Sequence, residues 1–276
     1  MRIDAHQHFW RYSASQYGWI DARMQRIARD FLPNDLAPKL AASEVDGCIA
    51  VQARCSDEET TFLLDLAAAN PFVKAVVGWT DLCAADAAAR VAALADEPLL
   101  RGLRHIVQAE PDDFLARADF QRGVRSLRAH GLVYDVLVYP RQLGAAEAFV
   151  RALPDQPFVL DHLAKPDIAA AQRDAWEQPF RALARHPHVA CKLSGMVTEA
   201  KWLAWRPDDF RWYLDTALDA FGEDRILFGS DWPVCLVAAA DYAQVHDLLA
   251  HWAERLGPVA RAKLFGGNAA RIYRIA

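Results

Sequence analysis

Two histidines near the start of the chain have a spacing that suits metal binding or catalysis. In the segment Asp4-Ala5-His6-Gln7-His8, the period-2 geometry of a β-strand places Asp4, His6 and His8 on one face. Two imidazoles on one face can share a metal ion, or can together hydrogen-bond a carbonyl substrate. The alternative is a pair of hydrogen-bonded core histidines, but the spacing favours the functional interpretation.

Two further groups end apolar runs later in the chain. Asp231 follows the run that begins at Ile226, and His162 follows the run that begins at Phe158. A carboxylate at such a position can ligate a metal, deprotonate water, or do both, whereas its alternative role is to cap the next helix. His162 taken alone is equally consistent with a buried structural histidine. A functional role for His162 is favoured only if it lies beside the other groups.

Lys192 lies inside the apolar run 189–195. Desolvation disfavours a buried ammonium unless the lysine is paired or used in chemistry. It could pair with Asp231 or Asp161, or it could polarise a substrate carbonyl. Both interpretations are kept as expectations.

The elements that would position these groups are short apolar runs alternating with amphipathic ones. Eight strand-like runs begin near positions 2, 47, 73, 100, 132, 158, 189 and 226, with helical segments between them. The alternation predicts a parallel sheet with right-handed crossovers, and eight units in about 250 residues match an α/β fold of the (β/α)₈ barrel type. An open doubly wound sheet is the alternative, but no glycine-rich phosphate turn follows any run. We therefore expect one barrel domain over residues 1–276.

In such a barrel the carboxyl ends of the strands form the catalytic mouth, so the groups above should converge there. Two long connections, 10–43 and 195–225, should overhang this mouth and carry aromatic residues that suit the apolar faces of a sugar ring. The expected substrate contacts are His105, Arg104, Arg101, Trp10, Trp232 and Tyr134.

Composition excludes several classes of partner. The formal net charge is −5 and no run of lysine or arginine occurs, which argues against nucleic acid and anionic membrane. Five cysteines without a CxxC pair argue against a disulfide framework or a zinc knuckle. No apolar leader or membrane-length run precedes the patterned region, so a cytoplasmic location is expected.

Taken together, the segments IDAHQHFW, RGLRHIVQ, VLDHLAKP, CKLSG and LFGSDWPV and the tail GNAARIY resemble the amidohydrolase superfamily over residues 2–273. More narrowly, they are similar to its lactonase branch, which includes L-fuconolactonases, L-rhamnonolactonases and the related 2-pyrone-4,6-dicarboxylate lactonases. The resemblance implies an amidohydrolase-type barrel and a lactone hydrolase.

The resemblance also implies roles for the residues. Asp231 would activate water for attack on the lactone carbonyl, and the developing oxyanion would be stabilised by histidines, by Lys192 or by a metal. The implied metal ligands are His6, His8 and Asp231, and the implied catalytic set adds His162 and Lys192.

The fourth strand-like run, which begins near position 100, differs from the corresponding strand in the two-metal members of the superfamily. It offers Arg104 and His105 where those members have a bridging lysine or glutamate, and strand five offers no histidine. One divalent metal such as zinc, or none, is therefore expected, and catalysis without it remains open.

A neutral sugar lactone such as L-fuconolactone fits better than a dicarboxylate, because few arginines converge on the mouth. The alternatives are a dicarboxylate lactone hydrolase or metal-dependent decarboxylase on the same barrel, or an inactive barrel that acts as a binding protein. The oligomeric state is left open.

Overall fold

The computed structural model describes residues 1–276 and contains one eight-stranded sheet. The strands pair in parallel and in sequence order: β1 (Ile3–Gln7), β2 (Gly47–Val51), β3 (Val73–Gly78), β4 (Leu100–His105), β5 (Val133–Val136), β6 (Phe158–Leu160), β7 (Val189–Leu193) and β8 (Ile226–Phe228). The ring is closed beyond β8, where the His8 amide donates to the Trp232 carbonyl at 2.7 Å. The predicted (β/α)₈ barrel is confirmed.

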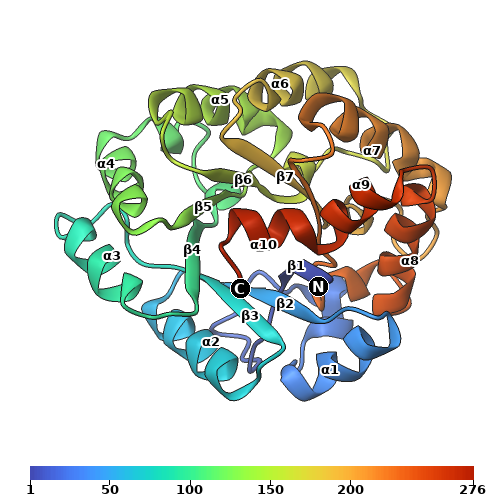
Figure 1. The fold of residues 1–276 in the computed structure, drawn as a ribbon, viewed down its shortest axis with the longest axis horizontal. Helices are drawn as coiled ribbons and strands as arrows, with labels where there is room; N and C mark the ends of the chain where they lie inside the picture. The colour runs from blue at the N-terminus through green and yellow to red at the C-terminus, as the bar shows by residue number, and fades with distance from the viewer.

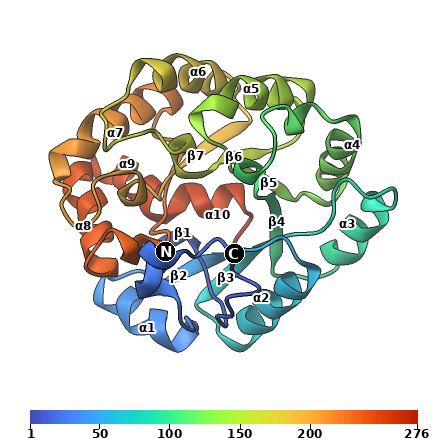
Figure 2. The same ribbon diagram turned by 180° about the vertical axis from the view of Figure 1, so that it is seen from behind.

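Helices surround the strands on the outside, except for α10, which crosses one end of the ring (Figures 1 and 2). They are α1 (Pro33–Ala42), α2 (Asp57–Ala69), α3 (Ala87–Ala95), α4 (Ala118–Ser126), α5 (Leu143–Ala152), α6 (Asp174–Ala184), α7 (Pro207–Phe221), α8 (Tyr242–Ala253), α9 (Pro258–Ala262) and α10 (Asn268–Ile272). Local chemistry sets several of their starts. The Ser56 hydroxyl accepts from the Glu59 amide before α2, and the Asp241 carboxylate accepts from the Gln244 amide before α8. None of the helices combines the length and apolar character needed to cross a membrane.

The half of the barrel interior near the amino-terminal ends of the strands, here called the lower half, is apolar. Small and branched side chains from successive strands pack there, including Ala5, Val77, Val133 and Val159. Helix α10 crosses the centre of the ring in Figure 1, and Tyr273 just after it packs into the same cluster. The amino-terminal mouth is thereby closed by the end of the chain, and polar chemistry is left to the upper half.

A β-bulge in β1 overturns one sequence expectation. The pairing of β1 with β2 shifts register between Asp4 and Gln7, so strict alternation fails there. Asp4 accepts hydrogen bonds from the amides of His6 and Ser230 and does not join the histidines. The prediction that Asp4 shares their face is wrong, because the extra residue reverses the side-chain parity.

Tyr273 provides a test of this closed end. Its hydroxyl donates to Asp135 Oδ1 at 2.7 Å, and both groups are buried. Tyr273→Phe should lower the free energy of unfolding by about 1–3 kcal/mol, because it leaves a buried carboxylate oxygen short of a donor. Urea denaturation measures this. Tyr12→Phe, at a half-buried surface position, is the control, and an equal effect of both variants would contradict the assignment.

Candidate active site and metal centre

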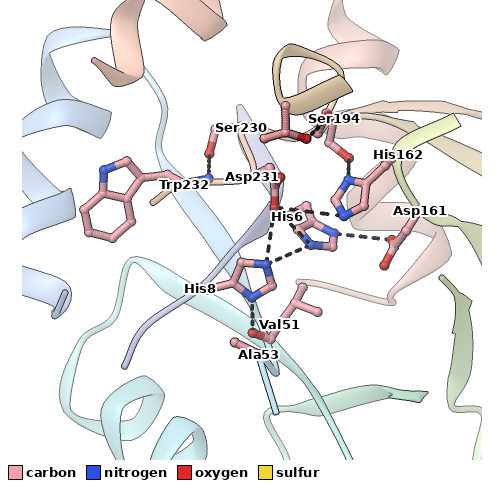
Figure 3. A network of polar contacts seen from close by, with 12 residues as sticks. His6, His8, Val51, Ala53, Asp161, His162, Ser194, Ser230, Asp231 and Trp232 are labelled. Carbon is pink, nitrogen blue, oxygen red and sulfur yellow. Dashed lines mark hydrogen bonds and ion pairs between the residues drawn. The ribbon is translucent and has the colours of Figure 1, made fainter. Parts of the chain in front are cut away.

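Four predicted residues meet at the carboxyl ends of the strands (Figure 3). Asp231 Oδ1 lies 3.3 Å from His8 Nε2, 3.8 Å from His6 Nε2 and 3.9 Å from His162 Nε2. His6 and His8 come from β1, His162 follows β6 and Asp231 follows β8. The exposed fractions of these four side chains do not exceed 4%. The barrel thus places one carboxylate among three imidazoles in a buried setting.

The donor atoms of His6, His8 and Asp231 fit a metal ion. His8 Nδ1 lies 2.7 Å from the Val51 carbonyl oxygen, which can only accept, so His8 carries its proton on Nδ1 and presents the Nε2 lone pair. That Nε2 lies 3.2 Å from His6 Nε2. Bonds of about 2.0–2.1 Å to a tetrahedral zinc ion would set ligand atoms roughly 3.3–3.4 Å apart. These three residues could therefore hold one divalent metal.

Two of the four residues have strained backbones. His162 and Asp231 have φ angles of 55° and 57°, in the left-handed region that non-glycine residues avoid, at a cost of about 1–2 kcal/mol each. The surroundings impose these angles. Trp176 Nε1 donates to the Leu163 carbonyl at 2.7 Å, and the Asp231 amide donates to the His6 carbonyl at 2.8 Å. The strain turns both side chains towards the site.

Burial and charge fix the protonation of the group. Burial raises the pKa of Asp231, but His162, His8 and His6 outweigh it and hold that pKa below the usual range. Burial lowers the pKa of His162 to about 4, and it lowers the pKa of His6 well below 6.5. An ionised Asp231 beside neutral His6 and His162 is the state in which these residues bind metal or accept a proton.

A layer of buried ion pairs lies directly below this site. Lys192 Nζ is 2.5 Å from Asp135 Oδ2 and 3.1 Å from Asp161 Oδ1, and it lies 3.2 Å from His6 Nδ1. The expected pairing with Asp161 is present, and Asp135 takes the place that Asp231 was expected to fill. With its ammonium held by two carboxylates below His6, Lys192 does not project into the mouth.

Strand four does not deliver the substrate contacts that were expected from it. Arg104 is buried and donates to Asp161 Oδ2 at 2.9 Å, so it belongs to the ion-pair layer. Arg101 stands near the amino-terminal start of β4, away from the mouth. His105 pairs with Glu110 at 2.9 Å and stacks on Phe114, outside the barrel. Of these three residues only Arg104 points into the barrel, and its guanidinium is already paired with Asp161.

The expected aromatic contacts are also placed differently. Tyr134 is fully buried against Phe120 and Phe149 in the outer layer, which contradicts a role in substrate binding. Trp10 and Trp232 are fully buried among other aromatic side chains. Trp10 packs between the His8 ring and Trp19, and Trp232 packs on Phe9 and Phe31. Trp19, in the long first connection, is 38% exposed.

Sequence reasoning missed two groups that support the site. Asp135 is not among the residues that the sequence predicts for the site, whereas its strand neighbour Tyr134 is. Ser194 was not singled out, yet its hydroxyl lies 2.9 Å from His162 Nδ1 and orients that ring. The alternation of side chains along a strand was the available signal, because residues i and i+2 point to the same face. Asp135 therefore shares a face with Val133, and Ser194 shares one with Lys192.

Gly195 offers a test of how His162 is held. Its φ is +61°, and a Cβ there would lie 2.4 Å from His162 Nδ1. Gly195→Ala should cost about 1–3 kcal/mol of stability and displace the imidazole. Gly144→Ala is the control, because a Cβ at Gly144 meets nothing within 4 Å and alanine suits a helix. Thermal unfolding and histidine NMR shifts measure both effects, and an unchanged His162 signal in Gly195→Ala would contradict the prediction.

Comparison with known proteins agrees with this architecture. The amidohydrolase family model matches residues 3–275. The chain is 50% identical over 287 residues to an L-fucono-1,5-lactonase of Burkholderia multivorans, covering 100% of this chain and 96% of that protein. It is 43% identical to an L-fucono-1,5-lactonase of Burkholderia ambifaria, covering 99% and 96% of the two chains.

A solved structure is equally close. An amidohydrolase from Burkholderia multivorans with bound zinc superposes with a TM-score of 0.95 at 49% identity, covering 100% of both chains. The family match spans nearly the whole sequence, and two relatives exceed 40% identity over 96% of their own length. This chain belongs to the amidohydrolase family.

Proposed function

We propose that the protein hydrolyses a sugar lactone, L-fucono-1,5-lactone, to the free sugar acid. The observation that carries this proposal is the ionised Asp231 among His6, His8 and His162, in a chain 50% identical to an L-fucono-1,5-lactonase over its whole length. Lactone hydrolysis needs a base for water, a donor for the carbonyl oxygen and a proton for the leaving alcohol. This group of side chains can supply all three.

Asp231 acts first as the base. Its carboxylate takes a proton from water while the water oxygen bonds to the carbonyl carbon. The bond from that carbon to the ring oxygen then breaks, and Asp231 returns its proton to the ring oxygen as the alcohol leaves. Water is consumed once and no other reactant is required.

His162 is placed to stabilise the oxyanion. When the Ser194 hydroxyl donates to Nδ1, His162 carries its proton on Nε2, which faces Asp231. That N–H can donate to the carbonyl oxygen as negative charge develops on it. The neutral ring at working pH, with its pKa lowered to about 4 by burial, is the form that this step needs.

His6, His8 and Asp231 would hold a single divalent metal, with zinc as the ion found in the Burkholderia multivorans structure. When bound, a zinc ion polarises a carbonyl and lowers the pKa of water. Lys192 serves this site indirectly, since its ammonium is taken up by Asp135 and Asp161.

A dicarboxylate substrate is disfavoured because the arginines near the mouth are already paired with carboxylates of the protein. Arg104 is used by Asp161, and Arg54 near the end of β2 is paired with Glu59 at 2.7 Å. Two carboxylates would require free, convergent guanidinium groups. A neutral aldonolactone makes no such demand.

Asp231→Asn should reduce turnover of L-fucono-1,5-lactone by at least about 10²–10⁴-fold, because the amide cannot accept the proton. A pH-indicator assay over L-fucono-, L-rhamnono-, L-galactono- and D-galactonolactone measures acid release, and circular dichroism checks the fold. Asp65→Asn on the exposed side of α2 is the control. Near-wild-type turnover in Asp231→Asn would refute the mechanism, and no acid release from any lactone by the wild type would refute the function.

His8→Ala should remove the metal while leaving the barrel intact. We expect about one zinc per wild-type chain by mass spectrometry after equilibration and desalting, and well below that in the variant, since one of three ligands is lost. His188→Ala, at the opposite mouth beside the Val150 carbonyl, should retain the wild-type zinc content. Equal zinc in both variants would rule out this ligand set.

A further inference from the structure

Asp161 is a fully buried carboxylate in contact with a proposed metal ligand. Its Oδ1 lies 3.3 Å from His6 Nδ1 and 3.1 Å from Lys192 Nζ, and its Oδ2 accepts from Arg104 Nη1 at 2.9 Å. Figure 3 shows Asp161 on the side of His6 away from Asp231. Both of its oxygens therefore lie beside cationic or donor groups of the protein, but only Oδ2 accepts a hydrogen bond of standard geometry.

Two groups of side chains in the structure could hold a metal, and they share His6. One is His6, His8 and Asp231, and the other is His6, Asp161 and His162. In the second group the carboxylate already balances the charges of Lys192 and Arg104, and an added divalent ion would face both cations at close range. In the first group Arg104 Nη1 lies 3.3 Å from His6 Nε2, but no cation pairs with the Asp231 carboxylate. We therefore assign the metal to the first group, and Asp161 is left as a neighbour of the ligands.

The ring of His6 must then be in one particular tautomer. A neutral imidazole has one N–H, and its Nε2 must keep a free lone pair to act with His8 Nε2, 3.2 Å away. The proton therefore sits on Nδ1, where Asp161 Oδ1 is the acceptor within reach. Lys192 Nζ also lies within hydrogen-bond distance of Nδ1, at 3.2 Å, but an ammonium can only donate. Once Nε2 is given to a metal and Nδ1 carries the proton, that contact gives way to Asp161 Oδ1, which lies 3.3 Å away and has no other hydrogen-bond partner.

We propose that Asp161 is a positioning residue that fixes His6 as the Nδ1–H tautomer and presents Nε2 to the metal. This inference rests on the proposed metal site. Lys192 and Arg104 keep the carboxylate charged and immobile, and they prevent it from turning towards the metal as a ligand. A carboxylate behind a ligating histidine orients the ring and makes it a stronger ligand.

Asp135 provides a matched control. It is equally buried and contacts the same ammonium at 2.5 Å, and its other oxygen accepts from Tyr273 at 2.7 Å. It makes no hydrogen bond or ion pair with His6. Asp135→Asn and Asp161→Asn therefore both remove a charge from the ion-pair layer, but only the second replaces the charged acceptor behind the metal ligand by a neutral, weaker one.

The experiment measures zinc affinity without substrate. A chromophoric chelator competes for zinc with the wild type, Asp161→Asn, Asp135→Asn and His8→Ala, and urea unfolding reports the stability of each. We expect affinity to fall about 10–100-fold in Asp161→Asn. It should stay close to wild type in Asp135→Asn, and stoichiometric binding should be lost in His8→Ala. Asp161→Glu keeps the charge balance if Asp161→Asn does not fold, and its displaced carboxylate should also weaken zinc binding.

Three outcomes would overturn the role of Asp161. They are unchanged affinity in both Asp161 variants, equal weakening in Asp135→Asn, and a loss of stoichiometric zinc in Asp161→Asn as complete as in His8→Ala, which would make Asp161 a ligand. A wild type that binds no zinc would overturn the metal site itself and this role with it. Lactone turnover is assayed separately, so failure of the proposed reaction is distinguished from failure of this inference.

Discussion

The structure depends on a buried pairing of charges across the barrel. The Lys192 ammonium of β7 is held by Asp135 of β5 and by Asp161, the residue after β6, and Arg104 of β4 completes the set. Such a pairing is stabilising only while every member has its partner, because a single unpaired charge in this position costs about 3–5 kcal/mol. The strands must therefore keep their mutual register, and the position of His6 above the layer follows from it.

The layered interior explains why chemistry is confined to one mouth. Apolar side chains and Tyr273 fill the lower half, the ion pairs occupy the middle, and the three histidines with Asp231 lie on top. Hydrogen bonds from the seam between β1 and the end of β8 support the strained backbone of Asp231. The local strain is thus balanced by the closure of the barrel, so that fold and site stabilise the same geometry.

Much of this was predictable from the sequence. The alternation of apolar runs indicated the barrel, and the residues at the ends of strands one, six and eight indicated the groups that meet. Two of the misplaced residues, Tyr134 and His105, share a physical cause. Parallel strands are buried on both faces, so an apolar pattern does not tell inside from outside. Tyr134 was therefore expected in the site although it packs outward, while Asp135 beside it faces Lys192. His105 fails for the same reason, and Asp4 fails because a bulge cannot be read from spacing.

The seam has a consequence for biosynthesis. β1 is made first and pairs with a segment that follows β8, while the Tyr273 hydroxyl that serves Asp135 is made later still. A nascent chain therefore carries its histidines and buried charges long before their last partners exist. Non-local pairing of this kind slows folding and exposes strand edges in the interval. The emerging half-barrel would be the state most in need of protection from association with other chains.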